Sequence, residues 1–262
     1  SAYAVGTSPF STKNNINVEQ NMYTQCEDLT NRRIFMGGAT ANLVNVGYDV
    51  NGLNTFTKTH TVSDRLICDG QMDSSSGFLL TETGRLIKFN QETLVRERVV
   101  ELALITSKHV LAPLSASNAA SSLVIGTYAS PAQIFVTNSA SLVVQDTITL
   151  SPLSNISSSA GFTNCQHVGE CTFASNVTFF VTETSPAYLI QFNLRTHNFS
   201  SILLPNDYAT SMTSTPDSTV LFMGTRDGNI STAQLDGDSQ MVNISHHFSI
   251  PLVNGLEHSN HI

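Results

Sequence analysis

Several features that would indicate particular protein classes are missing from this sequence. It contains no Trp, and charged residues make up only 12% of its 262 positions, about half the share of about 25% in average proteins. No run of Lys and Arg is longer than Arg32-Arg33, and the net charge is −8. Because nucleic-acid binding needs clustered basic residues, we expect no nucleic-acid partner.

Apolar residues are plentiful but never form a long uninterrupted run. They make up 40% of the chain, which is enough for a sizeable core, yet no stretch approaches the roughly 18 residues of a membrane span. The segment Ser1-Ala2-Tyr3-Ala4 lacks the basic and apolar regions of a signal peptide, and it is compatible with a mature end left after cleavage. The weakly charged surface favours a secreted, extracellular protein without a membrane span.

A short apolar phrase that stops on Gly or Thr recurs five times. Its copies end at Gly37, Thr81, Gly126, Thr182 and Gly224, with spacings of 44, 45, 56 and 42 residues. A period of roughly 40–50 residues made of short strands is typical of propeller blades. A single blade cannot bury its apolar faces without neighbours, so we expect residues 1–262 to form one all-β domain.

Each repeat divides into short strands separated by turns. In the second repeat, residues 77–81, 85–90 and 95–102 are predicted as strands, with a Gly-containing turn after the first. The fifth repeat follows the same plan, with strands predicted at 220–224 and 230–235. The small residues of 209–213 are expected in an innermost strand, where the blades crowd together.

Five full repeats leave two ends of the chain to place. Residues 254–262 are expected to supply an inner strand and residues 2–18 the strands beside it. Together the two ends would close a ring of six blades and hide its unpaired strand edges. Rings of five or seven blades are the alternatives.

The repeat pattern resembles β-propellers with NHL- and WD-type blades across nearly the whole chain, without the Trp-Asp and Gly-His dipeptides of WD repeats. The first repeat is also similar to the opening blade of semaphorin and plexin ectodomains. The likeness rests on the segment Phe35-Met36-Gly37-Gly38-Ala39, on Leu53 and on Cys68. This second resemblance implies an extracellular signalling module with seven blades and no enzymatic activity.

Five Asn-x-Ser/Thr triplets lie in the second half of the chain, where about three are expected anywhere by chance. Each is a candidate N-glycosylation site in a secreted protein. The asparagines are Asn155, Asn176, Asn198, Asn229 and Asn243.

The four cysteines favour a disulfide framework in an oxidising compartment. The short loop between Cys165 and Cys171 suits one bridge, which leaves Cys26 to pair with Cys68. Three connectivities are possible in principle, and four buried thiols in a cytosolic protein are a further alternative. A zinc site at Cys165, His167 and Cys171 matches the usual ligand spacing poorly.

No constellation typical of an enzyme is present. The sequence lacks a Gly-x-Ser-x-Gly elbow, a phosphate-binding loop and a His-Glu-x-x-His motif. An axial carboxylate site is the alternative, because propeller glycosidases use such acids. The acids considered for it are Asp64, Asp69, Asp207, Asp217 and Glu257. Metal candidates are the pair His258 and His261, and the acidic loops containing Asp227, Asn229, Asp236 and Asp238, which turn chemistry explains more simply.

These observations predict a secreted, N-glycosylated propeller that works by surface contact. We expect no enzymatic activity, no cofactor and no metal. The expected partners are another protein or further copies of this chain, as in an extracellular assembly or filament. A propeller hydrolase or lyase with an axial carboxylate or metal site, and a semaphorin- or plexin-like signalling ectodomain, are the alternative functions.

Overall fold

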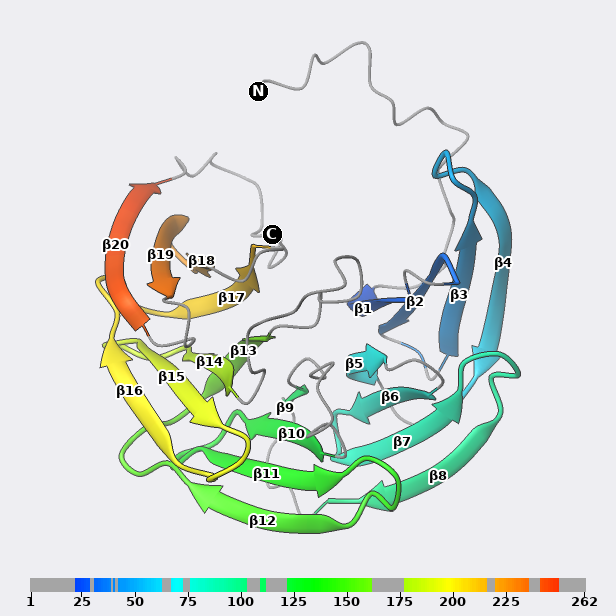
Figure 1. Ribbon diagram of the computed structural model, residues 1–262, viewed down its shortest axis with the longest axis horizontal. Helices are drawn as coiled ribbons and strands as arrows, with labels where there is room; N and C mark the ends of the chain where they lie inside the picture. Colours follow the sequence, from blue (N-terminus) through cyan, green and yellow to red (C-terminus); the bar gives the residue numbers. More distant parts are fainter. Residues whose placement is uncertain are drawn as a thin grey trace.

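The computed structural model describes residues 22–28, 31–38, 40, 42–62, 67–72, 76–102, 109–111, 122–161, 177–215, 220–235 and 241–249. These residues form 20 strands and no helix. The strands make five antiparallel sheets of four, each built from consecutive strands in chain order. Figure 1 shows the sheets side by side around a common centre, with one end of the arc at β1–β4 and the other at β17–β20.

We number these sheets as blades one to five along the chain. Blade one contains β1 (Met22–Asp28), β2 (Arg33–Gly38), β3 (Asn42–Tyr48) and β4 (Asn54–Thr61). Blade two contains β5 (Ile67–Met72), β6 (Ser76–Thr81), β7 (Arg85–Asn90) and β8 (Arg96–Glu101). Blade three contains β9 (His109–Leu111), β10 (Ser122–Thr127), β11 (Gln133–Asn138) and β12 (Val144–Thr149). Blade four contains β13 (Ile156–Gly161), β14 (Val177–Thr182), β15 (Tyr188–Asn193) and β16 (Phe199–Leu203). Blade five contains β17 (Ala209–Ser214), β18 (Val220–Thr225), β19 (Asn229–Leu235) and β20 (Met241–Ser249).

The five recurring apolar phrases are the second strands β2, β6, β10, β14 and β18, as the repeat predicted. The small-residue segment is confirmed as the innermost strand β17, and the outer strand β8 lies close to the predicted strand 95–102. The β-propeller architecture is therefore confirmed, with five blades among the described residues. The expected contributions of residues 2–18 and 254–262 lie outside those residues.

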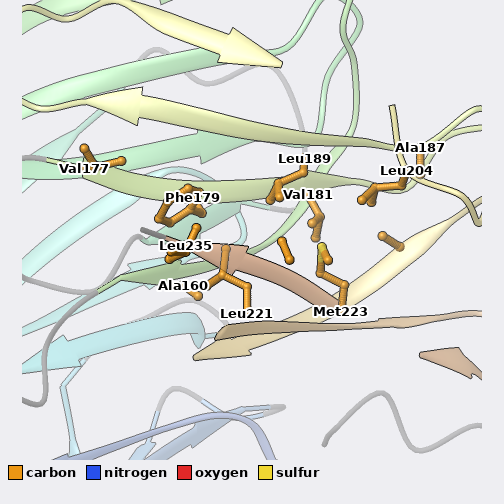
Figure 2. Packing of buried hydrophobic residues seen from close by; sticks show 12 residues of the cluster. Ala160, Val177, Phe179, Val181, Ala187, Leu189, Leu204, Leu221, Met223 and Leu235 are labelled. Carbon is orange, nitrogen blue, oxygen red and sulfur yellow. The ribbon is translucent and has the colours of Figure 1, made fainter. Parts of the chain in front are cut away.

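The core consists of four apolar layers, each between two successive blades. Neighbouring residues of the second strand point to opposite sides of a blade. Phe179 therefore joins the layer toward blade five, while Phe180 joins the layer toward blade three. Figure 2 shows the layer between blades four and five, where Phe179 of β14 lies near Leu221 of β18 and Leu235 of β19. Each fully buried side chain of this kind contributes about 1.5–3 kcal/mol.

The outward face of blade five differs from these layers. Phe222 is the third residue of β18, the position at which Phe78 and Phe179 point toward the next blade and are fully buried. Phe222 instead exposes 37% of its surface. Met36 of β2, which points away from blade two, is likewise only half-buried. Among the described residues, no sheet lies between these two faces.

Candidate functional site

Buried threonines shape one face of the propeller. The Oγ1 atom of Thr127 accepts a hydrogen bond from the Gln133 N–H at 2.8 Å, and Thr182 does the same for Tyr188 at 2.8 Å. Thr81 and Thr225 make the equivalent bond in blades two and five. Each bond closes the turn between the second and third strands, which explains why four of the five second strands end on Thr. We call the side that carries these turns the upper face.

The residue after each threonine therefore lies in a turn on the upper face. In blades three, four and five these residues are Tyr128, Glu183 and Arg226. The Arg226 guanidinium forms an ion pair with the Glu183 carboxylate. It also lies over the Tyr208 ring, 5.0 Å from the ring centroid. Three successive blades thus contribute to one cluster, which we call the upper-face cluster: Tyr128, Glu183, Tyr208 and Arg226.

Charge and burial are unevenly distributed in this cluster. The Glu183 side chain is only 10% exposed, whereas that of Arg226 is 53% exposed. Burial raises the pKa of Tyr128, and the negative charge of Glu183, which accepts a hydrogen bond from its hydroxyl, raises it further. The hydrogen bond to Glu183 and the attraction of its charge raise the pKa of Arg226. At neutral pH the cluster therefore presents a permanently charged guanidinium flanked by two phenols.

Backbone hydrogen bonds between blades hold this cluster in place. Tyr208 has φ of 52°, and its N–H donates to the Thr184 carbonyl at 2.8 Å while its own carbonyl accepts from the Arg226 N–H at 3.0 Å. Asn155, with φ of 54°, repeats the arrangement one blade earlier, between Ala129 and Glu183. Asn tolerates this left-handed conformation better than most residues. These bonds join the upper-face turns of blades three, four and five to one another.

The acids proposed for an axial site do not come together in the described part of the chain. Asp207 is exposed, and its Oδ2 accepts a hydrogen bond from Ser185 Oγ at 2.6 Å, so it links two upper-face turns. Asp69 lies on the inner strand β5. Asp64, Asp217 and Glu257 lie outside the described residues.

The candidate metal ligands are mostly outside the described residues as well. This holds for Cys165, His167, Cys171, Asp236, Asp238, His258 and His261. Asp227 and Asn229 lie in and directly after the β18–β19 turn. Within the described ranges, no group of three or more His, Cys, Asp or Glu residues could hold a metal ion. The same ranges contain no helix with the length and hydrophobicity of a membrane span.

The asparagines of the candidate glycosylation sites differ in their surroundings. Asn155 is half-buried at the start of β13, and Ser157 of the same triplet donates a 2.6 Å hydrogen bond to the Ala209 carbonyl. Asn229 is half-buried at the start of β19. Asn243 lies on the outer strand β20, and Asn176 lies outside the described residues.

Among the triplets with described side chains, that of Asn198 has the most accessible surroundings. It ends the turn before the outer strand β16, and Asn198, Phe199 and Ser200 are all exposed. By contrast, the second and third residues of the triplets at Asn155 and Asn229 are buried.

Two of the four cysteines lie on neighbouring inner strands. Cys26 is on β1 and Cys68 on β5, and these strands pack against each other. Cys26 is buried, and its Sγ lies 3.5 Å from where a Cβ on Gly70 would stand. The pairing of Cys26 with Cys68 stays a prediction, as does that of Cys165 with Cys171, which lie outside the described residues.

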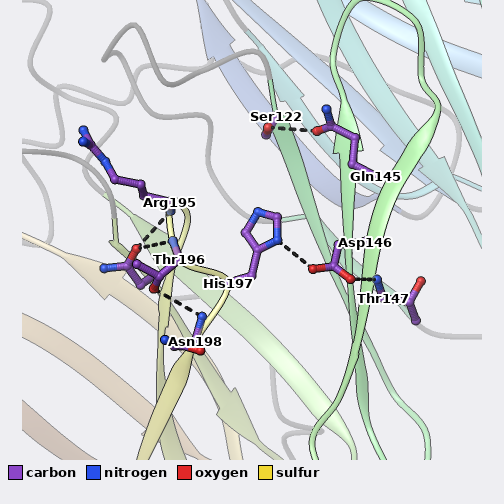
Figure 3. A network of polar contacts seen from close by, with 9 residues as sticks. Ser122, Gln145, Asp146, Thr147, Arg195, Thr196, His197 and Asn198 are labelled. Carbon is purple, nitrogen blue, oxygen red and sulfur yellow. Dashed lines mark hydrogen bonds and ion pairs between the residues drawn. The ribbon is translucent and has the colours of Figure 1, made fainter.

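One polar contact between blades was not predicted from the sequence. His197 Nδ1 lies 2.7 Å from Asp146 Oδ2, across the boundary between blades three and four (Figure 3). The sequence signal for this contact appears only when the turns between the third and fourth strands of each blade are aligned. The position that holds His197 holds the buried Leu94 and Leu142 in blades two and three, and all three residues have positive φ. A polar residue at a position otherwise occupied by buried leucines indicates a polar partner.

Comparison with known proteins supports the fold but indicates no function. No protein-family model matches the chain, and no curated protein matches its sequence. Among solved structures, a chain from the crystal structure of the mitotic checkpoint complex is similar over 91% of this chain, with a TM-score of 0.66 and 12% identity. A chain of hydrazine synthase from Kuenenia stuttgartiensis is similar over 82%, with a TM-score of 0.61 and 9% identity.

These likenesses place the chain in the β-propeller class. This chain covers 67% of the first matched chain and 64% of the second. At such low identity the likeness shows the fold alone, because one fold hosts many unrelated functions.

Proposed function

We propose that this chain is a secreted, N-glycosylated β-propeller that acts by binding a protein partner through its upper face. The observation that carries the proposal is the upper-face cluster. Tyr and Arg are the residue types most enriched at the energetic centres of protein interfaces. Here Tyr128, Tyr208 and Arg226 come together on turns that backbone hydrogen bonds join across blades three to five.

The chemistry of the cluster defines the partner surface that suits it. Glu183 neutralises part of the Arg226 charge from below, while the exposed part of the guanidinium remains available for hydrogen bonds. The two phenols add flat apolar area that costs little conformational entropy to bury. A partner loop that offers a carboxylate or backbone carbonyls to Arg226 is the expected ligand.

The proposed secretion and glycosylation have separate support. The exposed triplet at Asn198 suits a glycan acceptor, and the low content of charged residues agrees with an extracellular surface. The outward faces of blades one and five support the proposed sixth blade, because Met36 and Phe222 remain partly exposed there. In the sequence, residues 2–18 precede blade one and residues 254–262 follow blade five.

A binding experiment with matched variants tests this function. The fluorescently labelled chain is applied to cultured cells and extracellular matrix from the species of origin, and saturable binding is measured. We expect Arg226→Ala to lose most of the binding. Arg195→Ala is the control, because Arg195 is exposed in a turn on the opposite face. Equal binding by wild type and Arg226→Ala, or no saturable binding by either, would reject an upper-face interaction.

A further inference from the structure

The outer strand of blade four lacks the charged residues that the outer strands of blades one, two and three carry. Charged residues on an edge strand prevent it from pairing with another chain. Lys58 lies on β4, four charged residues lie on β8, and Asp146 lies on β12. β16, which reads Phe199-Ser200-Ser201-Ile202-Leu203, has no charged residue, and all five side chains are exposed.

Three of these five residues are large and apolar. Phe199, Ile202 and Leu203 are exposed, the last by 56%. One side of β16 pairs with β15, and no described strand pairs with its other side. Asn198 directly precedes this edge, and Pro205 lies two residues after its last residue, Leu203. The available edge is therefore short and bounded at both ends.

The hydrogen bonds with β15 show which backbone groups of β16 point outward. The Asn193 N–H donates to the Asn198 carbonyl at 2.9 Å, and the Leu204 N–H donates to the Ala187 carbonyl at 2.9 Å. Hydrogen-bonded and non-hydrogen-bonded pairs alternate in an antiparallel sheet. Since the backbone groups of Asn198 and Leu204 bond to blade-four residues on the β15 side, the backbone groups of Ser200 and Ile202 also point toward β15. The N–H and C=O groups of Phe199, Ser201 and Leu203 therefore point away from the sheet.

This edge is complementary to itself. When a second β16 lies antiparallel with the two Ser201 residues opposite each other, each Phe199 lies opposite the Leu203 of the other copy. Residues directly opposite in an antiparallel pair share a face. The Phe199 and Leu203 side chains of the two copies then form two apolar pairs on one face. All three outward-pointing residues find hydrogen-bonding partners, and no like charges meet.

We propose that two copies of this chain form a symmetric dimer by antiparallel pairing of their β16 strands. The two sheets of blade four join into one continuous sheet of eight strands across the two-fold axis. The occupant of the edge is a second copy, because its sequence places Phe199 opposite Leu203 and Ser201 opposite Ser201 among the residues that make the new backbone hydrogen bonds. This contact is isologous and closed, so it yields a dimer and not a filament. It is independent of the upper-face interaction.

Sedimentation of the full chain, after enzymatic removal of any N-glycans, tests the dimer. We expect a concentration-dependent dimer of twice 28.3 kDa for the wild type and a monomer for Leu203→Lys. Val95→Lys is the matched control and should remain dimeric, since Val95 is 61% exposed in the turn before β8. A wild type that stays monomeric at about 100 μM, or a dimeric Leu203→Lys, would overturn the proposal.

Amide hydrogen exchange then tests the register of the pairing. The N–H groups of Phe199, Ser201 and Leu203 should exchange slowly in the dimer and quickly in Leu203→Lys. Those of Ser200 and Ile202, which bond to β15, should be protected in both. A dimer in which Phe199, Ser201 and Leu203 still exchange quickly uses another surface, and that result would also overturn the proposal.

Discussion

Asp146 and His197 join two blades through a contact of 2.7 Å between a carboxylate oxygen and an imidazole nitrogen. Asp146 belongs to the outer strand β12, and His197 occupies the last-but-one position of the turn before β16. The hydrogen bond from His197 lowers the pKa of Asp146, and a further bond from the Thr147 N–H lowers it more. The contact links the rims of blades three and four, whose apolar layer lies nearer the centre.

This contact predicts a pH dependence of stability. Because the folded-state pKa of Asp146 is depressed, its contribution is present at pH values above its unfolded pKa of about 3.9 and is lost as the pH falls through the lower, folded value. Asp146→Ala should therefore be less stable than wild type at pH 7 and equally stable near pH 2. Urea unfolding at both pH values measures the difference. A gap that is unchanged at low pH would contradict this role.

The buried threonine at the end of the second strand should be important for stability. Thr127→Val keeps the side-chain shape but removes the acceptor for the Gln133 N–H. Leaving such a donor without a partner costs about 1–3 kcal/mol. Thr147→Val, on the exposed strand β12, should change the free energy of unfolding far less. Equal effects of the two substitutions in chemical denaturation would show that the turn is closed in another way.

Gly77 is required by the close approach of an aromatic ring. A Cβ at this position would stand 2.1 Å from the nearest atom of the Phe89 ring, which itself packs against Phe35 of blade one. Gly77→Ala should therefore destabilise the protein by about 1–3 kcal/mol through overpacking. Adding Phe89→Leu should relieve part of this cost, so that the double variant loses less than the sum of the single losses. Strict additivity would contradict the steric explanation.

The absence of Trp offers a direct test of the proposed sixth blade. Phe222→Trp places the only Trp of the chain on the outward face of blade five. If residues 254–262 pack there, deleting them should shift the fluorescence emission to longer wavelength, because the indole becomes solvated. Leu203→Trp, at the exposed edge of β16, serves as the control and should not respond. Identical spectra for the full and shortened Phe222→Trp chains would exclude this closure.

Much of the fold could be predicted because each blade repeats one physical plan. The second strands are buried on both sides, so they appear in the sequence as apolar runs. Their terminal Thr or Gly marks the following turn. The turn bond made by Thr182 depends only on residues six positions apart, which is local enough to leave a sequence signal. Near the start of the sequence, Val5-Gly6-Thr7 resembles the recurring phrase, but it lies outside the described residues.

The upper-face cluster could not be predicted in the same way. Glu183 and Arg226 are 43 residues apart, and they meet only because the ring places successive turns side by side. Neither residue belongs to a motif with a recognised spacing. Their shared position directly after the terminal Thr of a repeat was the one available signal. The contact of His197 with Asp146 was missed for a related reason. The polar residue becomes conspicuous only when its turn is aligned with those that hold the buried Leu94 and Leu142.

Mass spectrometry of the protein from its natural source tests the central claim most directly. Cleavage after Arg195 and Arg226 yields a peptide of residues 196–226, in which Asn198 is the only candidate glycosylation site. The account predicts a glycan on this peptide, and conversion of Asn198 to Asp when peptide N-glycosidase removes it. An unmodified peptide 196–226 together with four reduced cysteines would contradict a secreted glycoprotein and indicate an intracellular propeller.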